Sequence, residues 1–341
     1  MIGRIIKYLV VTSVVAAFIV AGVLYYAATN WRSQAPAEVE IAPGSSVSKM
    51  ADTLAKSGVI RMPKLFTLVA RIKGSAGKLK AGTYEFESGT TMLAALEKIE
   101  RGEVKQYPFT IIEGWRIDDI VKALSEQPFT KGSDIAQKFK TLVRDPTFIT
   151  SLGLGGADSL EGYLFPDTYL ITKPVTAEML LKRFISRFRE VWQGMGFAGK
   201  EVSGLDERQT LTLASLIEKE TAASAERPLV ASVFMNRLAK GMLLQSDPTI
   251  IYGLENFNGN IHKSDITNPH PYNTYVHPGL PPGPICNPGK ASIEAAMRPA
   301  KSNVLYFVAK GDGTHFFSEN LADHNAAVTQ YQLRGGGGEK Q

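Results

Sequence analysis

An uncharged, largely apolar run near the N-terminus constrains this chain more than any other feature. The run covers residues 8–28, and Arg4 and Lys7 precede it while Arg32 follows it. A helix rises about 1.5 Å per residue, so this run spans the roughly 30 Å hydrocarbon core of a bilayer. The slight excess of preceding positive charge places the N-terminus in the cytoplasm. The sequence therefore predicts a retained single-pass anchor, with the rest of the chain beyond the cytoplasmic membrane.

A cleaved signal peptide is the alternative that the same run allows. The small residues 27–29 offer a cleavage point. The apolar part of a signal peptide, however, has only about 7–15 residues, which is shorter than this run. The length therefore favours the anchor.

The composition excludes several classes of protein. With 341 residues, 44% of them hydrophobic, the chain can form a buried core in more than one module. A single cysteine excludes an internal disulfide framework and multi-cysteine metal sites. The net charge of +5 is modest and no stripe of lysine and arginine occurs, so the chain does not have the pattern of a nucleic-acid binder.

Three segments share one pattern, in which a short alternating strand is followed by a glycine and then a helix. The glycines are Gly44, Gly89 and Gly114, and the positions 3, 6, 7 and 10 residues beyond each are apolar. This spacing marks one face of an α-helix. Hydroxyl residues follow the first two glycines and are candidate N-caps. The pattern predicts small β-α units, with a further helix over residues 64–73.

The first of these units, residues 39–58, resembles LysM-type modules, which bind glycans that contain N-acetylglucosamine. Residues 81–103 show a similar pattern. A structural module that binds nothing is the alternative, because a fold pattern does not establish a function.

Residues 160–169 (LEGYLFPDTY) combine three aromatic side chains with Glu161 and Asp167. Aromatic faces beside carboxylates suit a sugar-binding cleft, and a buried turn is the alternative because aromatic side chains favour burial. Residues 153–157 (GLGGA), just before this segment, are predicted to be a flexible junction.

Two glutamates lie near the end of a helix predicted over residues 207–220. Glu218 and Glu220 are two positions apart, hence about 200° around the helix, so only one of them can face a given cleft. Glu218 shares its face with small residues that would admit a bulky substrate. Glu220 extends the apolar stripe, where a hydrogen bond to another helix is plausible. Periodicity does not choose between the two.

An uncharged polar loop follows over residues 271–289, which are dense in proline and glycine. Its Tyr272, Asn273, Thr274 and Tyr275 offer ring faces, hydroxyls and an amide, which suit neutral sugars. Cys286 lies in this loop without an adjacent histidine or cation and is expected to be packed rather than reactive. The five histidines form no short metal-binding motif, and neither a G-x-S-x-G elbow nor a P-loop occurs.

The ordered motifs LEGYLFPDTY, ASLIEKE, NRL, LQSDPTIIYG, YNTY, GLPPGPICNPG and YFV…H.FS resemble the MltG/YceG family of endolytic murein transglycosylases over about residues 36–330. The resemblance implies an α+β protein with an N-terminal transmembrane helix. A small LysM-like α/β module would follow, and then a mixed helical/β catalytic domain with a lysozyme-like active-site glutamate. The expected boundaries are 1–30 for the anchor, 36–105 for the LysM-like module, 106–157 for a β-α connecting segment, 158–332 for the catalytic domain and 333–341 for a flexible tail.

The same resemblance implies an inner-membrane lyase with a periplasmic catalytic domain. Such an enzyme cleaves the MurNAc–GlcNAc β-1,4 bond within peptidoglycan strands and leaves 1,6-anhydro-MurNAc ends. Nascent strands are its expected substrate. The resemblance makes Glu218, the first glutamate of the E-K-E motif, the catalytic acid and base. Seven further residues fall in motifs expected to line or support the cleft: Asn236, Gln245, Asp247, Tyr252, Tyr272, Asn273 and Tyr275. Cys286 departs from the family pattern, which has a small residue there.

The expected partners are peptidoglycan strands, the inner membrane and the peptidoglycan synthases, without nucleic acid, metal or cofactor. In the expected mechanism, Glu218 protonates the glycosidic oxygen and then takes the proton of the MurNAc C6 hydroxyl, which attacks C1. Two alternatives remain open. One is a hydrolytic muramidase in which Asp247 is the second carboxylate. The other is a non-catalytic, membrane-anchored glycan-binding scaffold.

Overall fold

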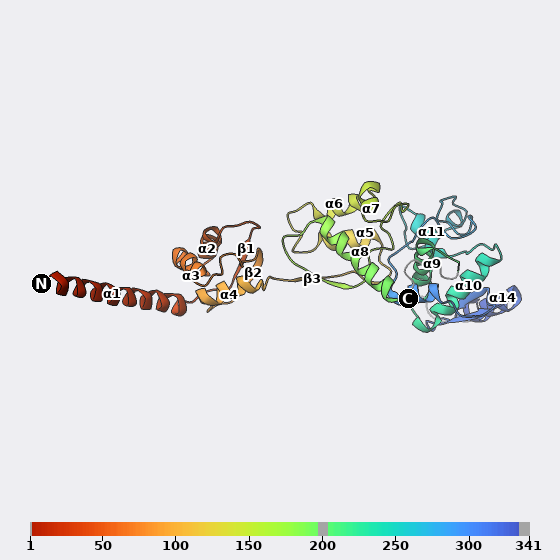
Figure 1. Cartoon of the computed structure of the whole chain (residues 1–341). Helices are drawn as coiled ribbons and strands as arrows, with labels where there is room; N and C mark the ends of the chain where they lie inside the picture. The colour runs from red at the N-terminus through yellow and green to blue at the C-terminus, as the bar shows by residue number, and fades with distance from the viewer. Residues whose placement is uncertain (1, 197–203, 334–341) are drawn as a thin grey trace. The chain divides into compact units, whose positions relative to one another are not determined.

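The computed structural model describes residues 2–196 and 204–333, and it divides into two compact units (Figure 1). The first unit consists of Met1–Pro108 with Leu170–Val175, and the second of Phe109–Tyr169 with Thr176–Gln341. From residue 109 on, the predicted connecting segment 106–157 belongs to the second unit. Helices predominate and strands are short, so the protein is of the mixed α+β class, as predicted.

The predicted anchor lies within one long helix, α1 (Ile2–Asn30). Large apolar side chains along it are exposed, among them Phe18, Ile19 and Val23. The side chains of residues 17, 20, 21 and 24 lie outside the described set. Across the part of the chain that the structure describes, no helix combines the length and the apolarity that a membrane crossing requires.

The rest of the first unit is a small α/β module. Strand β1 (Ala37–Ile41) pairs antiparallel with β2 (Gly82–Phe86), and Val39 lies opposite Tyr84. Helices α2 (Val47–Lys56) and α3 (Pro63–Ile72) connect the two strands, and α4 (Met92–Arg101) follows them. The inward faces of all five elements form one apolar core. The helix predicted over residues 64–73 is therefore confirmed as α3.

The threefold strand–glycine–helix pattern is also confirmed. Gly44, Gly89 and Gly114 have φ of +71°, +87° and +78°, a left-handed backbone that glycine adopts without steric cost. The predicted caps form, since the side chains of Ser46 and Thr91 accept hydrogen bonds from backbone amides in the first turns of α2 and α4. The third helix of the pattern, α5 (Ile117–Ser125), belongs to the second unit.

The second unit surrounds one buried helix. Its elements after α5 are α6 (Ile135–Leu142), α7 (Pro146–Ser151), α8 (Ala177–Gly194), α9 (Glu207–Glu220), η1 (Ser224–Glu226), α10 (Arg227–Ala239), α11 (Asp247–Gly253), α12 (Lys263–Ile266), α13 (Lys290–Met297), β5 (Tyr306–Ala309), β6 (His315–Ser318), α14 (Leu321–Val328) and η2 (Thr329–Leu333). Strands β5 and β6 form an antiparallel hairpin. Strand β3 (Tyr107–Thr110) pairs with β4 (Thr168–Ile171), and the chain passes between the units within these strands.

Helix α9 is the buried helix. Every residue from Thr210 to Ile217 is buried, and α10, α11 and α13 all pack against it. A capping box starts it, in which Asp206 accepts from the Gln209 amide and the Gln209 side chain accepts from the Asp206 amide. A helix that is buried around its whole circumference lies in the interior of a domain. Helix α9 therefore forms the core of this unit.

The proline-rich loop is fixed against α9. The Ile285 amide donates to the Ser215 hydroxyl (3.0 Å), and the Cys286 thiol donates to the Ser215 carbonyl (3.4 Å). Cys286 is fully buried, and this burial raises the pKa of its thiol. The expectation of a packed cysteine is confirmed.

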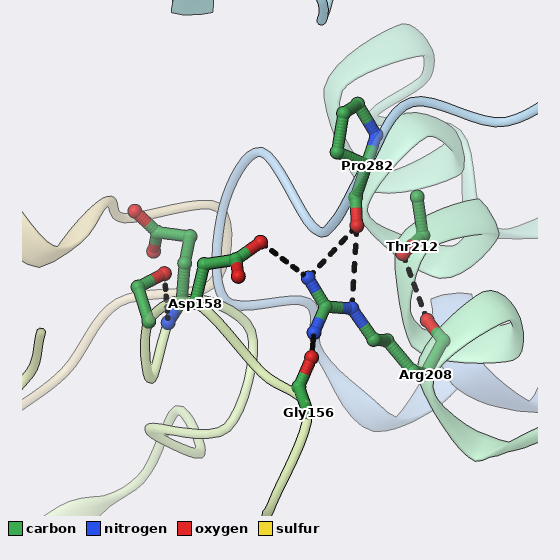
Figure 2. A network of polar contacts seen from close by, with 7 residues as sticks. Gly156, Asp158, Arg208, Thr212 and Pro282 are labelled. Atoms are coloured by element: carbon green, nitrogen blue, oxygen red, sulfur yellow. Dashed lines mark hydrogen bonds and ion pairs between the residues drawn. The ribbon is translucent and has the colours of Figure 1, made fainter. Parts of the chain in front are cut away.

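Arg208, in the first turn of α9, connects this loop with the segment before residue 160 (Figure 2). Its guanidinium donates to the Pro282 carbonyl (2.9 and 3.2 Å), to the Gly156 carbonyl and to the Asp158 carboxylate (3.0 Å). The GLGGA segment, which we expected to be a flexible junction, is thus tied to the core at Gly156.

Glu161 is a buried structural carboxylate. Only 3% of it is exposed, and it accepts hydrogen bonds from the Ile117 amide (3.1 and 3.2 Å) and from the Asn287 side chain (3.0 Å). Burial raises its pKa to about 8, although the Ile117 amide and the positive charge of Arg116 oppose the shift. The neighbouring Tyr163 and Phe165 are buried as well. Residues 160–165 thus form a buried turn, the alternative to a sugar cleft, and the chain then enters strand β4.

We expect Glu161→Gln to stabilise the protein at alkaline pH. The folded-state pKa lies above the unfolded value of about 4.3, so folding retains a proton that the unfolded chain releases. The stability that this carboxyl contributes is complete below the unfolded pKa and is lost as pH rises through about 8. Glutamine stays neutral, so the variant should gain on the order of 3 kcal/mol over wild type between pH 5 and pH 9. Denaturant unfolding at both pH values measures this gain.

Glu126→Gln is the matched control, because Glu126 is exposed at the opposite end of α5. Its effect should not depend on pH. An equal stability difference at pH 5 and pH 9 for Glu161→Gln would contradict the assignment of a neutral buried carboxyl.

Candidate active site

A pocket of about 450 Å³ lies in the second unit. Parts of the chain that are distant in sequence form it: the end of α9, helix α10, the start of α11, the β5–β6 hairpin and α14. The lining residues are Glu220, Arg237, Leu244, Gln245, Asp247, Tyr275, Phe307, Val308, Ala309, His315, His324, Val328 and Gln332. This volume is within the range of small-ligand sites.

Glu220 is the last residue of α9 and lies in the wall of this pocket. The Ser246 hydroxyl donates a short hydrogen bond of 2.5 Å to its Oε1. Burial raises the pKa of the carboxyl to about 7. The negative charge of Asp247 adds to this effect, while the Ser246 hydrogen bond and the positive charges of His315 and Arg237 oppose it. A carboxyl with this pKa exchanges its proton readily at neutral pH.

The segment that carries Ser246 is held in an unusual backbone conformation. Gln245 has φ of +52°, and among the described non-glycine residues it alone has a positive φ. Thr274 fixes the backbone of Gln245 and Ser246. Its carbonyl accepts from the Gln245 amide (3.2 Å), and its hydroxyl accepts from the Ser246 amide (3.0 Å). Strained backbone that its surroundings enforce is typical of functional sites.

Arg237, on α10, connects two parts of the pocket wall. Its guanidinium donates to the carbonyls of Leu305 (2.7 Å) and Leu244 (2.9 Å) and lies over the Tyr306 ring (5.2 Å). The ring of His324 stacks on the same tyrosine, with 5.2 Å between the ring centres. Burial lowers the pKa of the Arg237 guanidinium. These contacts connect the α10 end of the pocket with β5 and α14.

His315 is held by a carboxylate outside the pocket wall. Glu226, at the end of η1, accepts from His315 through both the backbone amide (3.0 Å) and ring Nδ1 (2.7 Å). Because a carboxylate accepts at Nδ1, that nitrogen carries a proton. In the described part of the chain, Nε2 of His315 makes no hydrogen bond and remains available on the pocket side of the ring.

Glu218 lies on a different side of α9 and does not line this pocket. Its Oε1 is 3.4 Å from the Arg227 guanidinium, and its Oε2 accepts from the Gly289 amide (2.9 Å). Only 7% of its side chain is exposed. The carboxylate therefore joins α9 to the start of α10 and to the end of the proline-rich loop. Of the two glutamates, Glu220 lines this pocket and Glu218 does not.

Three of the seven residues predicted to line or support the cleft lie in the pocket wall. They are Gln245, Asp247 and Tyr275, and the Tyr275 hydroxyl donates to Asp247 Oδ1 (2.6 Å). Asn236 is a neighbour that does not line the pocket. Its amide donates to the carbonyls of Ser302 and Val304 (both 2.9 Å) and so holds α10 to the segment before β5.

The other three predicted residues support the surrounding loops. The Asn273 amide donates to the carbonyls of Asp265, Ile266 and Asn268 and closes the turn after α12. Tyr252 and Tyr272 pack together with 4.7 Å between ring centres. The guanidinium of Arg116 lies 4.6 Å above the Tyr252 ring.

Sequence reasoning missed Ser246, Arg237, His315 and His324 as pocket residues. Periodicity left the choice between Glu218 and Glu220 open, and the resemblance made Glu218 the catalytic residue. Glu220 and Ser246 are 26 residues apart, and Glu226 and His315 are 89 residues apart, so periodicity carries no sign of either pair. The only local signal was the position of Ser246 and Arg237 inside the motifs LQSDPT and NRL.

The pocket contains groups that acid–base catalysis uses. It presents one carboxyl that is readily protonated near neutral pH, with amide, phenol and imidazole groups around it. The chain matches the YceG-like family over residues 39–330 and belongs to that family.

Named relatives span most of this chain. An endolytic murein transglycosylase of Bacillus subtilis is 35% identical over 315 residues, which is 88% of this chain and 86% of that protein. An endolytic murein transglycosylase of Streptococcus pneumoniae is 32% identical over 86% of this chain, which spans 58% of the pneumococcal protein. A crystal structure of a YceG-like protein from Listeria monocytogenes is similar with a TM-score of 0.56, at 32% identity over 85% of this chain and 98% of that one.

We expect the left-handed backbone at residue 245 to show in a pair of variants. Both Gln245→Ala and Gln245→Gly remove the side chain, but only glycine adopts a φ of +52° without strain. The glycine variant should therefore be more stable than the alanine variant by about 1 kcal/mol, measured by denaturant unfolding. At ordinary positions glycine is the less stable of the two. An alanine variant as stable as the glycine variant would show that this backbone relaxes.

Proposed function

We propose that this protein is an endolytic murein transglycosylase in which Glu220 is the catalytic acid and base. Membership of the YceG-like family and the two named relatives support the activity on peptidoglycan. The observation that carries the residue assignment is the pocket itself, where Glu220 combines a pKa of about 7 with a position in the wall.

The reaction requires a single carboxyl. Protonated Glu220 donates its proton to the oxygen of the MurNAc–GlcNAc β-1,4 bond as the bond from MurNAc C1 breaks. The carboxylate then takes the proton of the MurNAc C6 hydroxyl, whose oxygen attacks C1 and closes a 1,6-anhydro ring. Water is not consumed and no covalent enzyme intermediate forms, in contrast to the usual two-carboxylate glycosidase.

The hydrogen bonds of Glu220 suit both steps. The Ser246 hydroxyl occupies Oε1, while Oε2 has no hydrogen bond within the described chain and is available to exchange the proton. A pKa near 7 populates both protonation states at neutral pH, as a group that acts first as acid and then as base requires.

Glu218, which the sequence resemblance favoured, lacks these features. Both of its oxygens are engaged, one by Arg227 and the other by the Gly289 amide. It also lies outside the pocket wall. On these contacts we propose Glu220 for the chemistry and keep Glu218, the residue that the resemblance names, as the alternative that the variants below separate.

The two glutamates can be separated by matched variants. Glu220→Gln removes the exchangeable proton and should lower turnover of purified, uncrosslinked glycan strands by about 10²–10⁴-fold. Its stability should be unchanged or higher, because it removes a buried carboxyl. Glu218→Gln weakens an ion pair with Arg227, so it should lower stability while the folded fraction still cleaves. Mass spectrometry of the products and denaturant unfolding measure the two effects.

The opposite pattern, with loss of cleavage in a fully folded Glu218→Gln variant and normal cleavage in Glu220→Gln, would return the role to Glu218. Cleavage by both folded variants would exclude a one-carboxyl mechanism at either position.

The products identify the reaction. Internal fragments that end in 1,6-anhydro-MurNAc are one water lighter than hydrolytic ends. Reducing MurNAc ends would instead support the hydrolytic muramidase.

Asp247→Asn tests the role of the second carboxylate in the pocket wall. The negative charge of Asp247 raises the pKa of Glu220, so its removal should lower that pKa. Because Glu220 must be protonated to act as the acid, the alkaline limb of the pH–rate profile should move to lower pH by up to about one unit. Abolished cleavage at every pH would make Asp247 a direct participant and favour the muramidase.

We further propose that helix α1 anchors the enzyme in the inner membrane, with the rest of the first unit and the second unit in the periplasm. The uncharged run 8–28 and the exposed apolar side chains of α1 support this placement. Glycan binding by the LysM-like module, action on nascent strands and contact with the peptidoglycan synthases complete the proposal. Flotation of the full-length chain with lipid vesicles tests the anchor, and recovery of the chain in the vesicle-free fraction would refute it.

A further inference from the structure

We propose that one face of the first unit rests on an anionic lipid surface beside the proposed anchor. This face, the α3 face, consists of Lys64, Leu68, Arg71 and Ile72 of helix α3, together with Arg61 just before the helix. The inference rests on the anchoring part of the proposed function. It adds a second contact with the membrane, made by the folded module itself.

Helix α3 carries its exposed apolar and basic residues together. Lys64, Leu68, Arg71 and Ile72 are spaced by four, three and one positions, so they share one side of the helix. Phe66 and Ala70 are buried on the opposite side, and Leu65 is buried at the edge of the face beside Ile72. Ile72 is 77% exposed and Leu68 is 44% exposed, although both lie in a helix with a well-formed core side.

The apolar part of the face continues onto α1. A hollow of about 400 Å³ lies between α3, α4 and the end of α1, and its lining is almost wholly apolar: Tyr25, Ala28, Leu65, Leu68, Val69, Ile72, Lys73 and Leu93. Figure 1 shows these three helices grouped where α1 ends. A continuous exposed apolar area of this kind marks an interaction site more often than a single exposed residue does.

A second hollow of about 380 Å³ borders the same end of α1. It is lined by Tyr26, Ala27, Asn30, Trp31, Arg61, Met62 and Met92, and Met62 is 42% exposed. Tyr25, Tyr26 and Trp31 thus cluster where the uncharged run ends. Tyrosine and tryptophan are enriched at the boundary between membrane and water. The α3 face therefore lies beside the end of the uncharged run, where we expect the bilayer surface.

The charge of this region complements an anionic surface. Between Asp52 and Glu85 the sequence carries seven lysine or arginine residues and no aspartate or glutamate. Lys73 and Lys78 pair with Glu97 and Glu100 of α4. Within the described residues, Arg61, Lys64 and Arg71 form no ion pair, and all three are exposed. Clusters of basic residues beside an apolar helix are typical of contact with anionic lipids.

The chemistry favours lipid over a glycan or a protein partner. A glycan would require aromatic faces and hydrogen-bonding groups, whereas the α3 face offers aliphatic side chains and cations. The continuity of the face with the uncharged helix α1 indicates the same apolar phase for both. Unpaired cations beside Leu68 and Ile72 match a surface that presents phosphates above acyl chains.

The single native cysteine permits a direct test in the full-length chain. Cys286 is fully buried, so a cysteine introduced by Ile72→Cys is the accessible thiol for a polarity-sensitive fluorophore. The labelled chain is reconstituted into vesicles of phosphatidylglycerol with phosphatidylcholine, or of phosphatidylcholine alone. We expect blue-shifted emission that brominated lipids quench, with a stronger effect in the phosphatidylglycerol vesicles.

Asp52→Cys is the matched control, because Asp52 is exposed on α2 and lines neither hollow. Its label should keep the emission of a water-exposed site. Replacement of Arg61, Lys64 and Arg71 by glutamine should abolish the preference for phosphatidylglycerol. These residues lie outside the active-site unit, so glycan cleavage should continue.

Three results would overturn the inference. Water-like emission at position 72 in vesicles that carry the chain would refute the α3 contact and leave the anchor and the enzymatic activity intact. A blue shift without quenching by brominated lipids would show a protein occupant instead. A chain that does not float with the vesicles would refute the anchor and the α3 contact together, while cleavage of glycan strands reports the enzymatic function separately.

Discussion

The complete burial of helix α9 is the constraint on which the rest of the second unit depends. Because its side chains from Thr210 to Ile217 are enclosed, neighbouring helices and the proline-rich loop must pack around its whole circumference. Polar groups at its two ends make the remaining connections, with Arg208 at the start and the two glutamates at the end. The pocket lies at the end of α9, where the surrounding elements no longer enclose the helix.

Glu218 and Glu220 show how far the surroundings determine the chemistry of identical side chains. They share one helix turn, yet their partners differ. Glu218 faces a guanidinium and a backbone amide, whereas Glu220 faces a serine hydroxyl and the pocket. Arg227 gives the first a permanent partner of opposite charge. Burial and the negative charge of Asp247 raise the pKa of Glu220. A structural and a chemical role can therefore lie within one short motif.

Local patterns predicted the fold better than the site. The glycine-spaced helix faces, the caps at Ser46 and Thr91 and the enclosed α9 depend on periodicity and on turn chemistry, which short segments contain. The choice between the two glutamates depends on Ser246 and Gly289, whose positions only the tertiary fold determines. That Tyr252 and Tyr272 line or support the cleft stays a prediction, because their rings also have partners within the fold. Tyr252 and Tyr272 suit a sugar, but they suit each other and Arg116 equally well.

The position of Glu220 as the last residue of α9 has an electrostatic consequence of its own. The carbonyl groups at the end of a helix point outward without partners and together amount to about half a negative charge. A carboxylate beside them is repelled by the main chain as well as by its neighbours. The backbone at the end of α9 therefore contributes to the proton affinity of Glu220. Replacement of side chains in the pocket wall does not change this contribution.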